Sequence, residues 1–297
     1  MKIVVTGSLG HISKPLTQIL TKNGHSVTVI SSTYERKQDI EDLGATAAIG
    51  KLQDKVFLAT TFKDADVVYC MEPPFNFFEH GADPAAYWIN IAENYVQAIL
   101  QADVTKVIHL SSIGAHTDNG VGILATHHAV ENILKALPHH VTIKFLRPVG
   151  FYYNMLSFIP TIKANGTIIQ NYGGNNKEPW VSPLDIAEVI AEEIGQPFMG
   201  RTIRYIASDE VSGDEVATIL GSALGKPALK WWVIPDNQYL ENLLAAGFNP
   251  VVAKGLVEMN KSRRHNLYDD YFQNRPALGK IKLQDFATEF AAAYNIR

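Results

Sequence analysis

Residues 1–13 combine a run of β-branched residues with two glycines, and this combination constrains the fold more than any other stretch of the chain. Residues 3–5 read Ile-Val-Val, a run that is typical of a central parallel strand buried on both faces. Gly7 and Gly10 follow at a spacing that predicts a sharp turn out of this strand into a helix. The stretch therefore predicts a strand, a turn and a helix in direct succession.

A helix after Gly10 would direct free N–H groups and its positive dipole end at a phosphate, and Pro15 fits its first turn. The spacing Gly7-x-x-Gly10-x-x-Ser13 differs from the dinucleotide fingerprint G-x-G-x-x-G in pitch and in the third glycine. Two interpretations are open: a pyrophosphate site, or a tight turn without a ligand. The strand and helix alternation that follows favours a pyrophosphate site made of Thr6, Gly7, Ser8, Leu9, Gly10, His11 and Ile12.

The composition is that of a globular protein, because 46% of the 297 residues are hydrophobic and 19% are charged. The net charge of −4 and the absence of a long basic run argue against a nucleic-acid binder. Cys70 is the only cysteine and no apolar run has transmembrane length, so we expect a cytoplasmic protein without a membrane segment. The ten histidines include two adjacent pairs that diverge on a helix, and we expect no metal site.

Strand and helix patterns alternate through the first half of the chain. We predict strands at 27–30, 45–49, 66–71, 106–110 and 141–146, and helices at 11–22, 34–43, 54–61, 84–101 and 122–137. Such βα units, joined by right-handed crossovers, predict an α/β fold of the Rossmann type with a doubly wound parallel sheet. Its ligand crevice would lie at the carboxyl ends of the strands.

The end of the second strand bears on the choice of nucleotide. Sites that prefer NAD carry an acidic residue there, whereas this chain has Ser31-Ser32-Thr33, followed by Arg36 and Lys37. Hydroxyl and cationic donors favour a 2′-phosphate, so we predict NADP(H) over NAD(H), with Ser31, Ser32 and Arg36 at the adenosine end. Alternatively, residues 35–37 are only the solvated start of the next helix.

Two further stretches follow strand ends at the expected crevice. An apolar, proline-containing loop at 71–78 places Phe75 and Phe77 where they would pack against a flat substrate, although ordinary core packing is an alternative for each. Ser111 and Ser112 follow the strand at 106–110 and would contact the nicotinamide ribose or a carbonyl substrate, or only form a strand-end turn.

Several motifs together resemble the NmrA-like group of atypical short-chain dehydrogenases/reductases over about residues 1–195. They are Thr6-Gly-Ser-Leu-Gly-His-Ile12, Leu110-Ser-Ser-Ile-Gly114, His127-x-x-x-Glu131, Leu146-Arg-Pro-Val-Gly-Phe151 and Trp180-Val-Ser-Pro-Leu-Asp-Ile-Ala187. The resemblance implies a Rossmann domain that binds NAD(P), usually NADP(H), and a small C-terminal lobe that closes the substrate cleft. The family includes NADPH-dependent quinone reductases, isoflavone-reductase-like proteins and catalytically silent redox sensors.

The chain departs from the patterns of this superfamily at two positions. No tyrosine has a lysine four residues later, so the usual Tyr-x-x-x-Lys acid is missing; His127 stands where the family often has lysine, as it does in quinone-reductase-like members. Ser32 occupies a position where many NADP-binding relatives carry arginine. We predict that Met71, Ser111, Ser112, His127, Pro148 and Val149 lie at the nicotinamide, and that Phe75, Phe77, Tyr152 and Trp180 form the substrate wall.

The missing Tyr/Lys acid argues against alcohol dehydrogenation, where a proton must be moved at a poorly acidic hydroxyl. Reduction of a quinone makes a smaller demand on proton transfer, because His127 or solvent could stabilise or protonate the hydroquinone anion. The prediction is NADPH-dependent reduction of a small flat electrophile such as a quinone, with His127 as the catalytic residue. His127 as a ribose ligand or structural residue, a dinucleotide sensor without turnover, and an isomerase or dehydratase with tightly held cofactor are alternatives.

The C-terminal third reads as a smaller lobe without a clear linker. We assign residues 1–155 to the nucleotide-binding domain, with 183–206 returning to it, and residues 156–297 to a substrate-side lobe. The patterns predict strands at 166–170, 202–206 and 229–234, and helices at 183–194, 212–224, 236–264 and 283–294. For residues 268–272, surface packing is favoured over a place in the cleft; the patterns leave the oligomeric state open.

Overall fold

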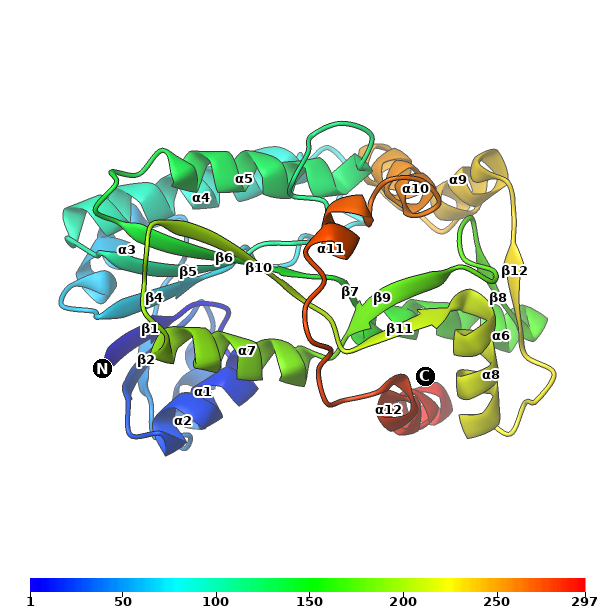
Figure 1. The fold of residues 1–297 in the computed structure, drawn as a ribbon, viewed down its shortest axis with the longest axis horizontal. Helices are drawn as coiled ribbons and strands as arrows, with labels where there is room; N and C mark the ends of the chain where they lie inside the picture. The colour runs from blue at the N-terminus through cyan, green and yellow to red at the C-terminus, as the bar shows by residue number, and fades with distance from the viewer. Residues whose placement is uncertain (297) are drawn as a thin grey trace.

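The central sheet has seven strands in the order β10-β6-β5-β4-β1-β2-β3, and all of its neighbouring strands are parallel (Figure 1). The computed structural model describes residues 1–296. The strands are β1 (Lys2–Val5), β2 (Ser26–Ser31), β3 (Thr46–Ile49), β4 (Val67–Cys70), β5 (Lys106–Leu110), β6 (Thr142–Pro148) and β10 (Arg201–Ile206). The predicted doubly wound parallel sheet is confirmed.

Helices cover both faces of this sheet (Figure 1). The first strand shows why: Ile3 and Val5 pack into the core on one face, and Val4 packs into the core on the other. One face is covered by α1 (Ser13–Lys22), α2 (Lys37–Glu41) and α7 (Pro183–Gly195), and the other by α3 (Lys55–Phe62), α4 (Pro84–Gln101) and α5 (Ala125–Lys135). A β-branched run suits such a strand because both faces are apolar.

A second lobe follows the carboxyl end of β6. Its strands form two small sheets, β11-β9-β7 and β12-β8. The strands are β7 (Gly150–Phe151), β8 (Thr167–Gln170), β9 (Lys177–Val181), β11 (Asp209–Ser212) and β12 (Lys230–Val233), and the helices are α6 (Ile159–Asn165), α8 (Gly213–Ala223), α9 (Asp236–Ala245), α10 (Pro250–Arg263), α11 (Asp269–Gln273) and α12 (Leu283–Ile296). An aromatic core containing Tyr152, Trp180, Trp231 and Phe290 holds the lobe together.

The chain passes between the two parts more than once. After β9, residues 183–206 form α7 and β10, and β10 pairs with β6 in the large sheet before β11 returns to the lobe. This supports the division that we propose, with 1–155 and 183–206 in the nucleotide-binding part. The lobe consequently lies beside the carboxyl ends of the large sheet (Figure 1).

Some predicted element limits differ from the observed ones. The first helix begins at Ser13 rather than near His11, because residues 7–12 are occupied by the turn. The helix predicted at 236–264 is two helices, α9 and α10, separated at Gly247, which has a φ of 86°. Within residues 1–296, no helix is long and apolar enough to cross a bilayer.

Candidate nucleotide and substrate site

The turn after β1 depends on the backbone freedom of Gly7. Its φ is 89°, and a Cβ at this position would lie 2.6 Å from Ser13 Oγ and would collide with Met71 Sδ. The Gly10 amide donates to Gly7 O at 3.1 Å, which closes the turn immediately before α1. A side chain at Gly7 would therefore be excluded both by conformation and by space.

Hydrogen bonds from neighbouring strands hold this turn in place. Thr6 Oγ1 accepts from the Met71 amide at 3.0 Å, and Ser13 Oγ donates to Thr6 O at 2.9 Å. Ser8 Oγ donates to Ser31 Oγ at 2.9 Å, which ties the turn to the end of β2. Thr6 and Ser31 are both buried, and their side chains hold the turn through these hydrogen bonds.

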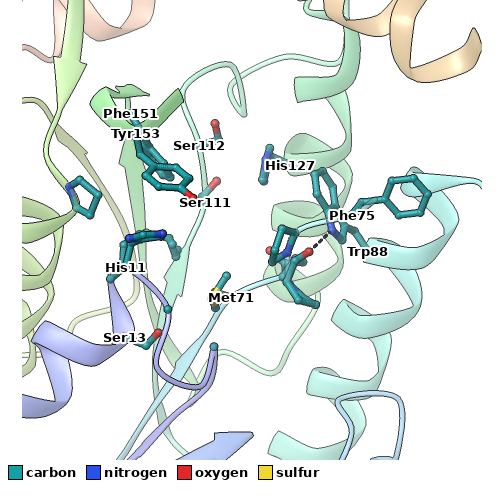
Figure 2. Close-up of a pocket in the computed structure, with 18 of the residues that line it drawn as sticks. His11, Ser13, Met71, Phe75, Trp88, Ser111, Ser112, His127, Phe151 and Tyr153 are labelled. Carbon is teal, nitrogen blue, oxygen red and sulfur yellow. Dashed lines mark hydrogen bonds between the residues drawn. The ribbon is translucent and has the colours of Figure 1, made fainter. Parts of the chain in front are cut away.

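A cavity of about 720 Å³ opens at the carboxyl ends of the parallel strands, where the β1 turn meets the loops after β4, β5 and β6. The N-terminus of α1 faces it through residues 10–13 and carries no side-chain cap. Figure 2 shows His11 and Ser13 on one side of the cavity and Trp88 and His127 on the other. The cavity therefore joins uncapped helix N–H groups to an aromatic pocket.

Most of the predicted site residues line this cavity. Those that do are Gly7, Ser8, Gly10, His11, Ile12, Ser32, Met71, Phe75, Phe77, Ser111, Ser112, His127 and Val149. Those that do not are Thr6, Leu9, Ser31, Arg36, Pro148, Tyr152 and Trp180. Residues that lie far apart in the sequence therefore meet at one edge of the sheet, as the topology requires.

The structure does not place Tyr152 and Trp180 in the substrate wall. Tyr152 is fully buried in the lobe, where its ring stacks on Phe286 with centroids 5.6 Å apart. Trp180 is 2% exposed and packs in the same core. The residues on either side of Tyr152, Phe151 and Tyr153, face the cavity instead (Figure 2).

Of the three residues predicted at the adenosine end, only Ser32 lines the cavity. Arg36 has a side chain that is 53% exposed, lies 3.4 Å from Asp39 and does not line the cavity. Lys51 lines it instead, because it follows β3, the strand that pairs with β2. A lysine two residues after the third strand was the sequence signal for this placement, since parallel strands end at a common edge.

His127 lies against Trp88, with ring centroids 5.2 Å apart. Its Nδ1 is buried without a hydrogen-bond partner among the described residues. Burial, which outweighs the attraction of the nearby Glu72 charge, lowers the pKa of His127 to about 4. The imidazole is therefore neutral at pH 7 and carries a single ring proton.

Glu72 lines the cavity and pairs with His109, which lies behind the cavity wall, and neither was among the predicted site residues. His109 Nε2 lies 3.1 Å from Glu72 Oε2 and 3.2 Å from Oε1. The Glu72 side chain is 2% exposed and His109 is fully buried. Their contact follows from the strand order: His109 in β5 is paired with Cys70 in β4, and Glu72 lies two residues after Cys70, beyond the end of β4.

Ser111 belongs to a second buried network. Its hydroxyl donates to Glu131 Oε1 at 2.6 Å, and Arg147 donates to both oxygens of the same carboxylate at 2.8 and 2.7 Å. Burial would raise the pKa of Glu131, but the hydrogen bonds and charge of Arg147 lower it to about 2. Because the Ser111 hydroxyl donates its proton to Glu131, the hydroxyl oxygen can accept a hydrogen bond from a ligand in the cavity.

The C-terminal lobe contributes residues to the cavity that were not predicted from the sequence. Tyr268 is 7% exposed and lines the cavity, and Tyr271 is fully buried. The prediction of surface packing for residues 268–272 is therefore wrong for both tyrosines. Arg263, at the end of α10, lines the cavity as well. No local sequence pattern marks these residues, since the lobe alone brings them to the cavity.

Comparison with known proteins relates the chain to reductases. It is 23% identical over 263 residues to a (4-alkanoyl-5-oxo-2,5-dihydrofuran-3-yl)methyl phosphate reductase of Streptomyces griseus, with 88% of this chain and 87% of the relative covered. The structure of the NADPH-dependent quinone oxidoreductase from Escherichia coli, complexed with NADPH, superposes with a TM-score of 0.80 at 18% identity. That match covers 97% of this chain and 99% of the other.

A second solved structure shares the fold over nearly the whole chain. The triphenylmethane reductase of Citrobacter sp., complexed with NADP(H), matches with a TM-score of 0.76 and 18% identity over 97% of this chain and 99% of the other. At these identities the likeness concerns the fold. The sequence profile of the NmrA-like family matches residues 1–285. The chain therefore belongs to the NmrA-like family.

Proposed function

We propose that the protein binds NAD(P)H in the cavity and reduces a small flat electrophile such as a quinone. One observation carries this proposal: a single cavity joins the uncapped N-terminus of α1 to an aromatic pocket around His127 and Trp88. The first part suits a pyrophosphate. The second suits a planar ring next to a nitrogen that can donate a hydrogen bond.

The residues at the α1 end fit a dinucleotide. Gly7 has no side chain that would displace Met71, which lines the cavity, and residues 11–13 offer backbone N–H groups to the diphosphate. We assign Ser32 and Lys51 to the adenosine end, where a lysine favours the 2′-phosphate of NADP(H). Arg36 lies near Ser32 in the sequence, but its side chain is exposed and pairs with Asp39. We therefore expect Arg36 to contribute less than Lys51 to nucleotide binding.

The nicotinamide end is bounded by Met71, Ser111, Ser112 and Val149. These residues would hold the reduced nicotinamide, which would supply the hydride for reduction of a quinone to the hydroquinone anion. Ser111 accepts a hydrogen bond because Glu131 holds its proton, whereas Ser112 has no such acceptor among the described residues. The two serines therefore present different hydrogen-bonding groups to the ligand.

The substrate end is apolar and aromatic. Phe75, Phe77, Trp88 and Phe151 line it, and aromatic side chains of this kind pack well against a planar substrate. The neutral imidazole of His127 can donate its N–H to an oxygen that gains negative charge, but it stores no second proton at pH 7. Water therefore delivers the proton that completes the hydroquinone.

The relatives support this proposal. The Escherichia coli structure is of an NADPH-dependent quinone oxidoreductase, and the Citrobacter structure is of a triphenylmethane reductase with NADP(H). The relative from Streptomyces griseus is a reductase of a dihydrofuranone phosphate. All three names describe reduction of a small molecule. We also propose a cytoplasmic location, which suits the single buried thiol of Cys70.

A dinucleotide sensor without turnover is the second candidate function. The observation that favours it is the pKa of His127, which leaves no cationic acid at this position at pH 7. A sensor of this kind would bind the reduced and oxidised nucleotide with different affinities. It would consume no NADPH in the presence of quinones.

The two functions are separated by one pair of measurements on the purified protein. Titration with NADPH and NADH, followed by energy transfer from tryptophan, measures binding, because Trp88 lines the cavity. NADPH oxidation at 340 nm with 1,4-naphthoquinone then measures turnover. Binding with turnover supports the reductase, binding without turnover with any of a panel of quinones supports the sensor, and no binding of either nucleotide contradicts both.

A further inference from the structure

Arg263 is a buried cation in the wall of an otherwise mostly apolar cavity. It is the last residue of α10, and its side chain is 9% exposed. Nε and Nη2 donate to the same oxygen, Glu178 Oε2, at 3.0 and 2.6 Å. The guanidinium carbon also lies 3.8 Å from the ring centroid of Tyr172 and 4.9 Å from that of Trp180. The side chain is therefore held in a single orientation.

The pairing with Glu178 leaves part of the guanidinium free. Nη1 forms no hydrogen bond with any residue of the described chain, and it is not among the polar atoms sealed in the interior. Arg263 lines the cavity, and Nη1 is its guanidinium nitrogen without a partner among the described residues. Burial opposes the charge, but the charge of Glu178 outweighs burial and raises the pKa of Arg263, so the group stays cationic.

The cavity is lined by few charged residues besides Arg263. Among the described residues that line the cavity, the permanent cations are Arg263 and Lys51, and the only acid is Glu72, which His109 holds. Lys51 follows β3 at the end that we assign to adenosine. Arg263 belongs to α10 of the C-terminal lobe, so the two cations reach the cavity from different parts of the fold.

Arg263 is also close to the strand end at which we place the nicotinamide. A Cβ on Gly150 would lie 3.8 Å from Arg263 Nη2, and Gly150 directly follows Val149. Tyr268 lines the same wall, and its hydroxyl lies beside the guanidinium. A substrate ring between this strand end and the aromatic pocket would therefore have Arg263 at its edge.

An ion pair in the interior adds little stability compared with apolar packing of the same volume. A fixed guanidinium with free N–H groups, by contrast, matches the geometry of an oxyanion. We propose that Arg263, oriented by Glu178 and Tyr172, binds an oxyanion attached to the flat substrate and thereby selects anionic over neutral electrophiles. The oxyanion is a carboxylate, sulfonate or phosphate. This inference rests on the proposed function, because it takes the substrate to occupy that cavity.

Calorimetric binding tests the oxyanion site without turnover. The probes are 2-naphthoate, 2-naphthyl phosphate and the neutral 2-naphthamide, each titrated with and without saturating NADP⁺. We expect the wild-type protein to bind at least one anion about tenfold more tightly than the amide, which corresponds to one charge-assisted contact. The two anions distinguish a carboxylate site from a phosphate site.

Two substitutions separate binding from a structural role. Arg263→Gln should bring the ratio of anion to amide affinity close to one, whereas Glu178→Gln should keep or increase the ratio, because it frees guanidinium donors. Both break the same ion pair, so both should lower the melting temperature. Arg264→Gln is the matched control, since Arg264 pairs with Asp236 at 2.8 Å and does not line the cavity. It should leave the ratio unchanged.

The proposal is overturned if the wild-type protein binds the amide as tightly as both anions, or if Arg263→Gln leaves the ratio unchanged. It is also overturned if Arg263→Gln and Glu178→Gln reduce the ratio equally, because Arg263 would then act only through the ion pair. NADPH oxidation with 1,4-naphthoquinone and 1,2-naphthoquinone-4-sulfonate tests the reductase separately. If neither is reduced while anion binding still depends on Arg263, the oxyanion site stands and the reductase proposal fails.

Discussion

Glu72 in the cavity wall and His109 behind it form a buried pair, with 3.1 Å between Glu72 Oε2 and His109 Nε2. His109 Nδ1 has no hydrogen-bond partner among the described residues, so the imidazole depends on Glu72 for its only polar contact. The pair connects the loop after β4 to β5. The position of this loop over the pocket therefore rests partly on one interaction.

Replacement of Glu72 tests the strength of this connection. Glu72→Leu should destabilise the protein by about 2–4 kcal/mol, because it leaves both nitrogens of a buried imidazole without a partner. Glu72→Gln keeps an acceptor and should cost about 1 kcal/mol. Urea unfolding at pH 7 measures both values. Equal losses of unfolding free energy in the two variants would contradict the hydrogen bond to His109.

The lowered pKa of His127 predicts a loss of stability in acid. The folded protein holds this group neutral down to about pH 4, whereas the unfolded chain protonates it near pH 6.5. The stability contribution is therefore complete above pH 6.5 and is lost as the pH falls toward 4. It amounts to about 3 kcal/mol at most, from the size of the shift.

Urea unfolding between pH 7.5 and 4.5 measures this contribution in the wild-type protein and in His127→Gln. The variant should lose less stability over this interval, because it has no imidazole to protonate at the site. His139→Gln serves as the control, since His139 is exposed. The same pH dependence in wild-type protein and His127→Gln would show that His127 is not held neutral.

Two glycine substitutions separate backbone strain from steric exclusion. Gly7→Ala should abolish NADPH binding and cost about 2–4 kcal/mol, because it combines a φ of 89° with collisions at Met71 and Ser13. Gly24→Ala is the matched control: its φ is 78°, but nothing lies within 4 Å of the added Cβ. It should cost about 1 kcal/mol and leave nucleotide binding intact, as urea unfolding and NADPH titration will show.

Nucleotide preference should depend on Lys51 more than on Arg36. Lys51→Met should weaken NADPH binding about tenfold or more and change NADH binding little, because only the 2′-phosphate needs the cation. Arg36→Ala should have a smaller effect, since Arg36 is exposed and lies beside Asp39. Fluorescence titration with both nucleotides measures the four changes. A larger effect of Arg36→Ala would reverse the assignment.

The sequence alone was enough to predict the parallel α/β fold and most of the cavity floor. β-branched runs and glycine turns act locally, and parallel strands must end at a common edge, so Gly7, Met71 and Ser111 were expected to meet. The cavity indeed contains all three. The helix at 84–101 and the strand at 106–110 were predicted with their observed limits, because Asp83, Pro84 and the apolar periodicity mark them directly.

Only the tertiary structure decided which side chains face the cavity from outside the sheet. The short 3₁₀ helix at Tyr152–Phe158 directs Tyr153 toward the cavity and Tyr152 into the lobe, and the sequence does not show which face of so short a helix packs against the lobe. Arg263 and Tyr268 reach the cavity through long-range packing of the C-terminal lobe. Local propensity specifies an element, but the contacts between distant elements depend on how the whole core closes, and these contacts determined the substrate end of the site.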